Sequence, residues 1–317
     1  MNRLFIILIS LFFSILAFSQ DNFNLKLTSS IKLDSIMLYD LSYLENSIMS
    51  LHGDTTVFIN TDGKNIFHLK SKHIDYYLFL NNNSKLELFI NDNYEVSITG
   101  DNKYFTYFLN QYYQNYHSNF NTNSTFFLNN NTDNFEINLY NYINTEIVDY
   151  YYEYEFLDEI SEYCRKYFQN LIHYEYLNAL SFFILNQNKG VTVNKEKKIP
   201  LSKDVNIDWL NIKELNDHLK DEDFYDMHVF QKYIFQTKLL FALDQYEYAL
   251  KDIEDFQSFS IHYLNFINQD ISSSLLFYCL YNYVDQYGSF LQVETFDYLI
   301  NSLKKQKINS IKIEKIQ

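Results

Sequence analysis

The spacing of hydrophobic side chains changes near residue 100, which predicts two kinds of structure in one chain. Before that point, apolar and polar residues alternate in short runs such as Phe23–Leu27, Leu86–Ile90 and Tyr94–Ile98. Alternation of this kind is typical of strands that are buried on one face, and the intervening stretches rich in Asn, Asp and Gly are typical of turns. We therefore predict an antiparallel β-sandwich-like domain over residues 20–100.

From residue 101 onwards, apolar residues recur at every third or fourth position, which is the spacing of amphipathic helices. Tyr104, Phe108 and Tyr112 lie four residues apart, and a longer pattern of the same kind predicts a helix over residues 135–169. No repeat holds at the roughly 34-residue period of helix-pair solenoids. The sequence therefore predicts an irregular α-helical bundle over residues 101–317 and an α+β fold class for the chain.

The first residues have the features of a secretory signal peptide. Arg3 supplies a positive charge, the apolar run Leu4–Ala17 follows, and small residues stand at Ala17 and Ser19. Because this run is shorter than the ~20 apolar residues of a membrane-spanning helix, we favour a signal peptide over residues 1–19 and keep an uncleaved anchor as the alternative. The mature protein is then expected to be periplasmic or secreted, with membrane contact through the signal peptide before cleavage.

Glycine usage and charge exclude several classes of function. The five glycines among 317 residues are all far apart, whereas phosphate-binding loops, dinucleotide-binding turns and nucleophile elbows need clustered glycines. The formal net charge is -15, from 25 Lys and Arg against 40 Asp and Glu. A chain this acidic repels nucleic acid and anionic lipid, so we predict no nucleic-acid partner.

Aromatic residues make up 19% of the chain and admit two interpretations. Exposed rings would offer stacking platforms for sugars, whereas buried rings would fill the core where other proteins use Leu and Ala. Because Tyr, Asn, Ile and Lys are abundant throughout, we favour the core interpretation.

The two cysteines give no sign of redox chemistry. Cys164 and Cys279 lie in aromatic-rich helical patterns, and neither belongs to a C-x-x-C motif. An exported protein can form a disulfide, but we favour buried, unpaired thiols that pack as small apolar residues. A disulfide between Cys164 and Cys279 is kept as the alternative.

The richest polar cluster is the segment Asp217–His228, which combines carboxylates with two histidines. It lacks the turn glycine of a calcium loop, and the ten-residue separation of His218 from His228 matches no standard zinc spacing. An acidic junction between helices explains it better. Pairs such as Asp158, Glu159 and Glu162 are typical of solvated helix faces. We predict no catalytic, cofactor-binding or metal-binding residue.

Other histidines have no nucleophile or carboxylate partner at a telling spacing in the sequence. They are His52, His68, His73, His117, His173 and His262.

Several segments resemble one known family. Asp62–Leu69, Leu86–Ile90 and Val96–Asp101 are similar to the amino-terminal β-domain of exported TlpA-like thioredoxin-family proteins of Bacteroidota. Phe266–Ser273 resembles the helical-region motif F-I-x-x-N-P-x-S of the same proteins, although Asp270 and Ile271 stand where the motif has Asn-Pro. The resemblance covers most of the mature chain through short motifs.

The resemblance implies a thioredoxin domain with C-x-x-C and a cis-proline after this region. The sequence ends at Gln317, about where that domain would begin, so the reductase residues have no positions in this chain. The expectation is therefore that the protein works without that domain or that the reading frame is cut short.

Two functions follow as expectations. The first is an exported, non-catalytic accessory or binding protein of the cell envelope, with a protein or glycan as its partner and no cofactor. The second is a remnant or partner subunit of a thiol-disulfide oxidoreductase whose thioredoxin domain is encoded elsewhere. A metal-binding protein centred on residues 221–228 is a weaker third hypothesis.

Overall fold

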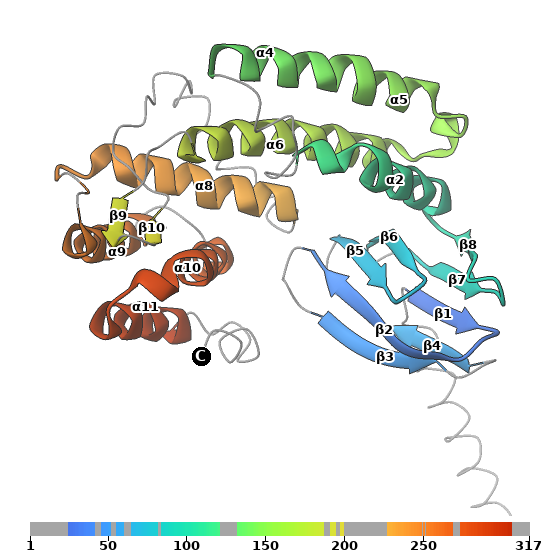
Figure 1. Cartoon of the computed structure of the whole chain (residues 1–317). Coiled ribbons are helices and arrows are strands. Elements are labelled where there is room, and N and C mark those ends of the chain that lie inside the picture. Colours follow the sequence, from blue (N-terminus) through green and yellow to red (C-terminus); the bar gives the residue numbers. More distant parts are fainter. Residues whose placement is uncertain are drawn as a thin grey trace, which may run out of the picture. The chain divides into compact units, whose positions relative to one another are not determined.

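The computed structural model describes the chain in segments: residues 25–41, 46–51, 55–59, 65–81, 84–120, 132–186, 191–194, 197–199, 227–248, 250, 252–268 and 273–305. The predicted signal peptide, and the polar cluster up to Asp226, lie outside these residues. Two sheets in the amino-terminal part precede a helical region, which confirms the α+β class (Figure 1). The described residues group into two compact units, here called the β unit (those from 25 to 114, with 154–164) and the helical unit (those from 115 to 153 and from 165 to 305).

The β unit contains two four-stranded sheets. One sheet has the order β4-β1-β7-β8 and the other β3-β2-β5-β6. Neighbouring strands are antiparallel except β1 and β7, which pair in parallel with Leu27 opposite Leu88. The prediction of an antiparallel domain is thus correct for all the pairs but this one. The strands are β1 Leu25–Ser29, β2 Leu33–Asp40, β3 Asn46–Leu51, β4 Thr55–Ile59, β5 Asn65–Lys70, β6 Asp75–Leu80, β7 Leu86–Ile90 and β8 Val96–Gly100.

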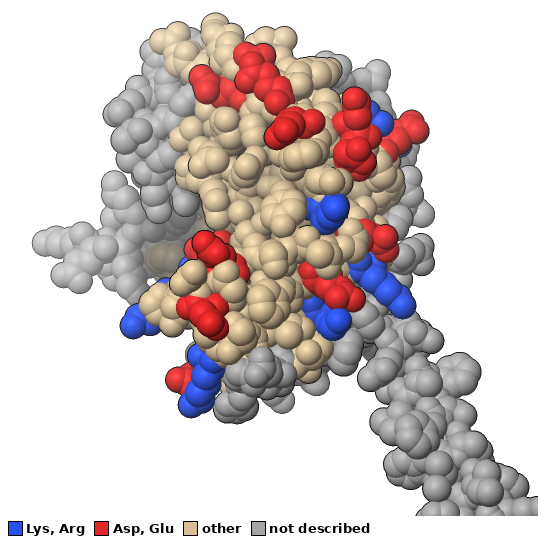
Figure 2. All heavy atoms as spheres, turned by 90° about the vertical axis from the view of Figure 1, so that its right-hand side faces the viewer, with Lys and Arg blue, Asp and Glu red and all other residues tan. Residues whose placement is uncertain are grey.

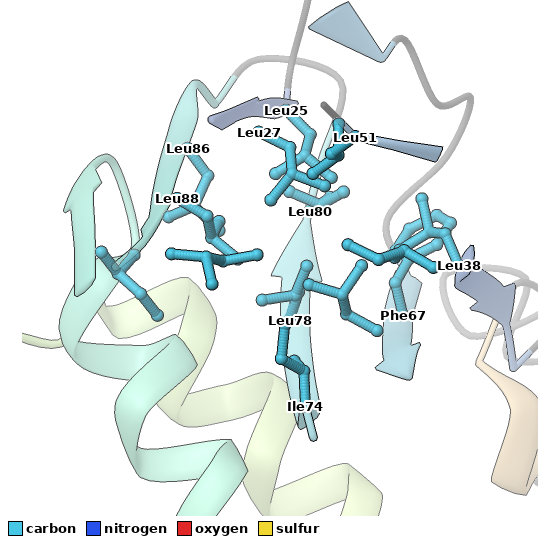
Figure 3. Close-up of a cluster of buried hydrophobic side chains, with 14 of the residues drawn as sticks. Leu25, Leu27, Leu38, Leu51, Phe67, Ile74, Leu78, Leu80, Leu86 and Leu88 are labelled. Carbon is cyan, nitrogen blue, oxygen red and sulfur yellow. The ribbon is translucent and has the colours of Figure 1, made fainter. Parts of the chain in front are cut away.

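Alternate residues of both sheets point into one shared core (Figure 3). Leu25 and Leu27 of β1 meet Leu78 and Leu80 of β6 across this core, as expected of a β-sandwich. Strand β2 departs from strict alternation, because its register against β3 shifts between Leu33 and Ile36. This β-bulge lets residues three apart face the same side.

Helix α2, Lys103–Asn115, covers the outer edge of β6 and satisfies its backbone. The Tyr77 N–H donates to Asn110 Oδ1 at 3.2 Å, and the Phe79 N–H donates to Thr106 Oγ1 at 3.5 Å. Gln114 Nε2 continues this ladder by donating to a backbone carbonyl of the same strand at 3.3 Å. Side chains four residues apart on α2 therefore form hydrogen bonds with backbone groups two residues apart on β6. These bonds cover the free edge of β6, which could otherwise pair with a strand of another chain.

In the helical unit, the central helix α8 is buried on nearly all sides. Tyr174 of α6 packs edge-on against Phe230 of α8, with ring centroids 4.8 Å apart, and Tyr263 of α9 stacks on Tyr283 of α10 at 4.6 Å. Rings thus fill this core. Its long elements are α4 Thr132–Tyr142, α5 Val148–Glu153, α6 Glu162–Asn186 (which begins in the β unit), α8 His228–Gln245, α9 Ile253–Ile267, α10 Ser273–Tyr287 and α11 Val293–Lys305.

Three features differ from the sequence-based prediction. Strand β3 was not predicted, because the adjacent Ile48 and Met49 break its alternation, and the hairpin of β9, Val191–Asn194, with β10, Lys197–Ile199, was not predicted, because its strands are only four and three residues long. The single helix predicted over 135–169 is wrong, because the chain leaves the helical path after Glu153 and re-enters it at Glu162. The residues between, 154–161, belong to the β unit together with the first three residues of α6 and most of α2.

Candidate functional site

The candidate site is the solvent-facing side of the helix formed by residues 132–153. This helix consists of α4, a π-helical turn η2 at Ile143–Ile147, and α5. Its inner side is anchored on α6, because Phe135 stacks on Phe183 with ring centroids 3.9 Å apart and Tyr151 stacks on Phe168 at 5.7 Å. The burial of Phe135 and Tyr151 fixes which side of the helix faces solvent.

Two side chains of the π turn bond back to carbonyl groups of the preceding turn. Asn144 Nδ2 donates to the Tyr140 carbonyl at 2.8 Å, and Thr145 Oγ1 donates to the Asn141 carbonyl at 2.9 Å. Side chains that bond back to carbonyls of the preceding turn compete with the regular helix ladder. Single π turns within α-helices are rare overall, and many of those known lie at functional sites. The π turn therefore favours the outer side of this helix as a functional surface.

Large apolar side chains protrude from that outer side. Ile137 is 59% exposed, Tyr140 is 60% exposed and Tyr152 is 70% exposed. Scattered exposed apolar residues are normal in proteins, but these three share one element with a row of exposed carboxylates. We call the following residues the α4–α5 face: Glu136, Ile137, Tyr140, Glu146, Asp149, Tyr152 and Glu153.

The α4–α5 face is uniformly acidic. The sequence from 132 to 153 contains no Lys, Arg or His. Glu136 accepts a hydrogen bond from the Tyr176 hydroxyl at 3.2 Å, which orients the carboxylate without neutralising it. Figure 2 shows red Asp and Glu side chains among tan ones, with a blue Lys or Arg beside them, in the upper part of that view, the level at which α4 and α5 lie in Figure 1.

A small cavity in the β unit is a weaker candidate. It measures about 180 Å³ and is lined by residues 100 and 102–105 on one side and 159–161 on the other. Ligand pockets usually occupy ~300–1,000 Å³. The Tyr104 ring beside it is already covered, by Lys103 Nζ at 4.5 Å from the ring centroid and by the Phe156 ring at 4.9 Å. Neither its size nor this ring favours ligand binding.

Both cysteines are buried, and each is a free thiol, in agreement with the sequence-based interpretation. Burial raises the pKa of Cys164 to about 11, and its S–H lies 3.5 Å from the acceptor Asn102 Oδ1. Burial also raises the pKa of Cys279 to about 12, although Lys238 and Tyr263 act in the opposite direction. The two groups are therefore held as protonated thiols, which are poor nucleophiles.

A buried carboxylate in the helical unit escaped sequence analysis. Glu175 of α6 is 2% exposed, and its Oε1 lies 3.1 Å from His117 Nδ1. Burial opposes its ionisation, yet the interactions with His117, Lys232 and His228 prevail and lower the pKa of Glu175. Burial lowers the pKa of His228 to about 3, against the opposing effect of Glu175. The sequence offered no signal for this cluster, because it joins three segments that are far apart along the chain.

The structure corrects the view that the histidines lack carboxylate partners. His117 pairs with Glu175, and His68 Nε2 lies 2.6 Å from Asp75 Oδ1. His73 and His173 are exposed, and His262 contacts the Tyr246 ring at 5.2 Å. His52 lies outside the described residues.

Of the other candidates from the sequence that the structure describes, His228 interacts with the His117–Glu175 pair. Of the segment Asp217–His228, the structure describes Met227 and His228, both at the start of α8. Asp158, Glu159 and Glu162 are all exposed, around a short 3-10 turn and the first turn of α6. Within the described segments, no group of three His, Cys, Asp or Glu side chains is arranged to hold a metal ion.

The aromatic side chains on the β unit are largely engaged with one another. On β2, β5 and β6, Tyr39, His68 and Tyr77 are cross-strand neighbours, and Tyr77 also stacks on Tyr113 of α2 with ring centroids 4.2 Å apart. The faces of Tyr77 are thereby covered by His68 and Tyr113. Rings stacked in this way do not present free faces to a sugar.

No helix within the described segments is long and apolar enough to span a membrane. Comparison with protein-family models finds no match, and neither the curated proteins nor the solved structures include a match to this chain.

Proposed function

We propose that this chain is an exported, non-catalytic binding protein of the cell envelope. The observation that carries the proposal is the α4–α5 face, where Ile137, Tyr140 and Tyr152 stand exposed among carboxylates. Exposing large apolar side chains to water costs free energy that burial against a partner recovers. Tyr is also among the residue types enriched at recognition surfaces, because a rigid amphipathic ring provides contact area at low entropic cost.

The alternative function is a subunit or remnant of a thiol-disulfide oxidoreductase. The state of the thiols limits this alternative to a chain that supplies no reductase cysteine of its own. Reductase cysteines need a lowered pKa and access to solvent, whereas Cys164 and Cys279 are buried and have raised pKa values. Any contribution to thiol exchange would then have to come from another chain.

Site-specific photocrosslinking in cells tests the proposal. A photoreactive phenylalanine analogue at position 152 is expected to give a discrete crosslinked product in the envelope fraction. The same analogue at position 298, where Tyr298 is 47% exposed on α11, serves as the matched control and is expected to give none. Retention of the chain in the cytoplasm, or equal crosslinking from both positions, would contradict the proposal.

An insulin-reduction assay separates the two functions. The purified chain is expected neither to reduce insulin disulfides alone nor to change the rate at which a candidate thioredoxin partner reduces them. A rate that rises when the chain is added to the thioredoxin would favour the oxidoreductase alternative.

A further inference from the structure

We propose that the α4–α5 face binds a cationic amphipathic segment, rich in Lys and Arg, of a partner protein. This inference rests on the proposed binding function and adds the chemistry of the partner. Its starting point is the shape of the surface. At ~1.5 Å rise per residue, α4 and α5 with the intervening turn form a ridge roughly 30 Å long, which matches the length of one amphipathic helix or strand of a partner.

The charge of the face selects among partner classes. Glu136, Glu146, Asp149 and Glu153 are exposed, and no basic residue lies between 132 and 153. Anionic lipid headgroups and nucleic acids would be repelled. A neutral glycan would leave the carboxylates unpaired as it displaced their water, at a cost in free energy. A basic polypeptide segment complements this charge and is steered towards it.

The order of residues along the face specifies the partner further. Ile137 and Tyr140 lie before the π turn, Glu146 and Asp149 lie within and just after it, and Tyr152 lies towards the end. A partner with apolar residues at both ends and basic residues between them matches this order. The Tyr faces add cation–π contacts to Lys or Arg, which favour cations over other polar groups.

The surface differs from other exposed positions of the helical unit. Helix α11 also exposes Val293 and Tyr298, but it carries Lys304 and Lys305 in its last turn. Its charge is therefore mixed. Exposed acids of similar number on α10 and α11, namely Asp285, Glu294 and Asp297, provide a matched control for net charge.

The test measures binding of a designed probe to the purified chain without residues 1–19. The probe is a fluorescein-labelled 20-residue amphipathic peptide of Leu and Lys, and the reference peptide has Glu in place of every Lys. Fluorescence anisotropy gives Kd at low and physiological salt. The Lys peptide is expected to bind with an affinity that falls as salt rises, and the Glu peptide is expected not to bind.

Paired variants locate the site. The variant Glu146→Gln/Asp149→Asn/Glu153→Gln and the variant Tyr140→Ser/Tyr152→Ser are each expected to raise Kd at least tenfold. The controls Asp285→Asn/Glu294→Gln/Asp297→Asn and Tyr248→Ser/Tyr298→Ser are expected to change Kd less than twofold. Circular dichroism spectra and thermal unfolding establish that each variant is folded.

Absence of binding by the Lys peptide, equal losses in the face and control variants, or an unchanged Kd in the Tyr variant would each overturn the inference. None of these outcomes decides whether the chain is a binding protein, because the crosslinking experiment tests that function separately. If crosslinking at position 152 persists while the peptide fails to bind, the chain is a binding protein whose partner is not basic.

Discussion

Gly100 ends β8 with a backbone conformation that other residues avoid. Its φ is +99°, and a Cβ added there would lie 2.3 Å from the Lys85 carbonyl oxygen. That carbonyl cannot move away freely, because it accepts a hydrogen bond from the Asp101 N–H at 2.7 Å, while the Lys85 N–H donates to Asp101 Oδ2 at 3.0 Å. Glycine at this position is therefore required by the turn that leads from the sheet into α2.

We predict that Gly100→Ala lowers the free energy of unfolding by at least about 2 kcal/mol, because strain and the clash with backbone add together. Gly288→Ala is the control. Its Cβ would meet the side chain of Phe296 at 3.3 Å, with no positive φ, so we expect a change within about 1 kcal/mol. Urea unfolding monitored by circular dichroism measures both, and equal effects would contradict the argument.

The cluster of the buried Glu175, the half-buried His117 and His228 and the exposed Lys232 predicts sensitivity to acid. The pKa of His228 is about 3 in the folded chain and about 6.5 when unfolded. Its contribution to stability is thus complete above pH 6.5 and is lost as the pH falls towards 3, because the unfolded state binds a proton that the folded state refuses. Glu175, whose pKa lies below 4.5, loses its contribution at lower pH, below 4.5.

Between pH 7.5 and pH 5, we expect the unfolding free energy of the native chain to fall by about 2 kcal/mol more than that of the His228→Gln variant. The exposed His73 provides the control variant His73→Gln, which should follow the native chain. Urea titrations of the three proteins at the two pH values measure these unfolding free energies. Parallel pH dependence of the native chain and His228→Gln would show that His228 is protonated in the folded state.

At the scale of secondary-structure elements, hydrogen bonds between side chains of α2 and the backbone of β6 join the helix to the strand. The helix offers Thr106 and Asn110, four residues apart, to the N–H groups of Phe79 and Tyr77, two residues apart on the strand. The spacing works because two strand residues and one helical turn both advance by roughly 5–7 Å. Tyr107 also accepts a hydrogen bond from the Ile98 N–H of β8 at 3.1 Å. One helix thus satisfies edge strands of both sheets.

We predict that Asn110→Ala destabilises the chain by about 1–3 kcal/mol, because it leaves the Tyr77 N–H without its acceptor. Asn115→Ala, at the exposed end of the same helix, should change stability by less than about 0.5 kcal/mol. Amide hydrogen exchange gives a more local measurement. The Tyr77 amide should lose protection in Asn110→Ala, and unchanged protection would argue against the ladder.

At the scale of the whole molecule, the strands alone do not make the β unit. The predicted domain 20–100 contains every strand of both sheets, but the compact unit also includes residues 101–114 and 154–164. Without α2, the edge of β6 and the ring of Phe79, which packs edge-on against Phe105 at 4.9 Å, would be open to solvent. Uncovered strand edges favour aggregation.

A fragment of residues 20–100 is therefore expected to aggregate, whereas a fragment of residues 20–120, which retains α2, is expected to be more soluble and to show the circular dichroism of folded strands. Size-exclusion chromatography of the two fragments makes the comparison. A monomeric, cooperatively unfolding fragment 20–100 would show that α2 is dispensable.

Much of the architecture follows from local patterns in the sequence. The change of hydrophobic period near Gly100 correctly separates strands from helices, because which residues face a core is repeated along each element. The same reasoning correctly places Cys164 and Cys279 as buried, unpaired thiols. It fails for β3, where the adjacent Ile48 and Met49 break the alternation, and at 154–161, where aromatic residues continue although the helix does not.

The tertiary structure decided the features that join distant residues. The parallel pairing of β1 with β7, the contact of His117 with Glu175 and the ladder from α2 to β6 each depend on which elements meet, and no local period encodes that. The solvent exposure of a side chain also depends on which elements meet. Tyr151 and Tyr152 are identical and adjacent in the sequence, yet the first is buried against Phe168 and the second is 70% exposed. The amino-acid sequence determined that this chain would be rich in rings and in acid, and the packing of its helices decided which rings face solvent beside the acids.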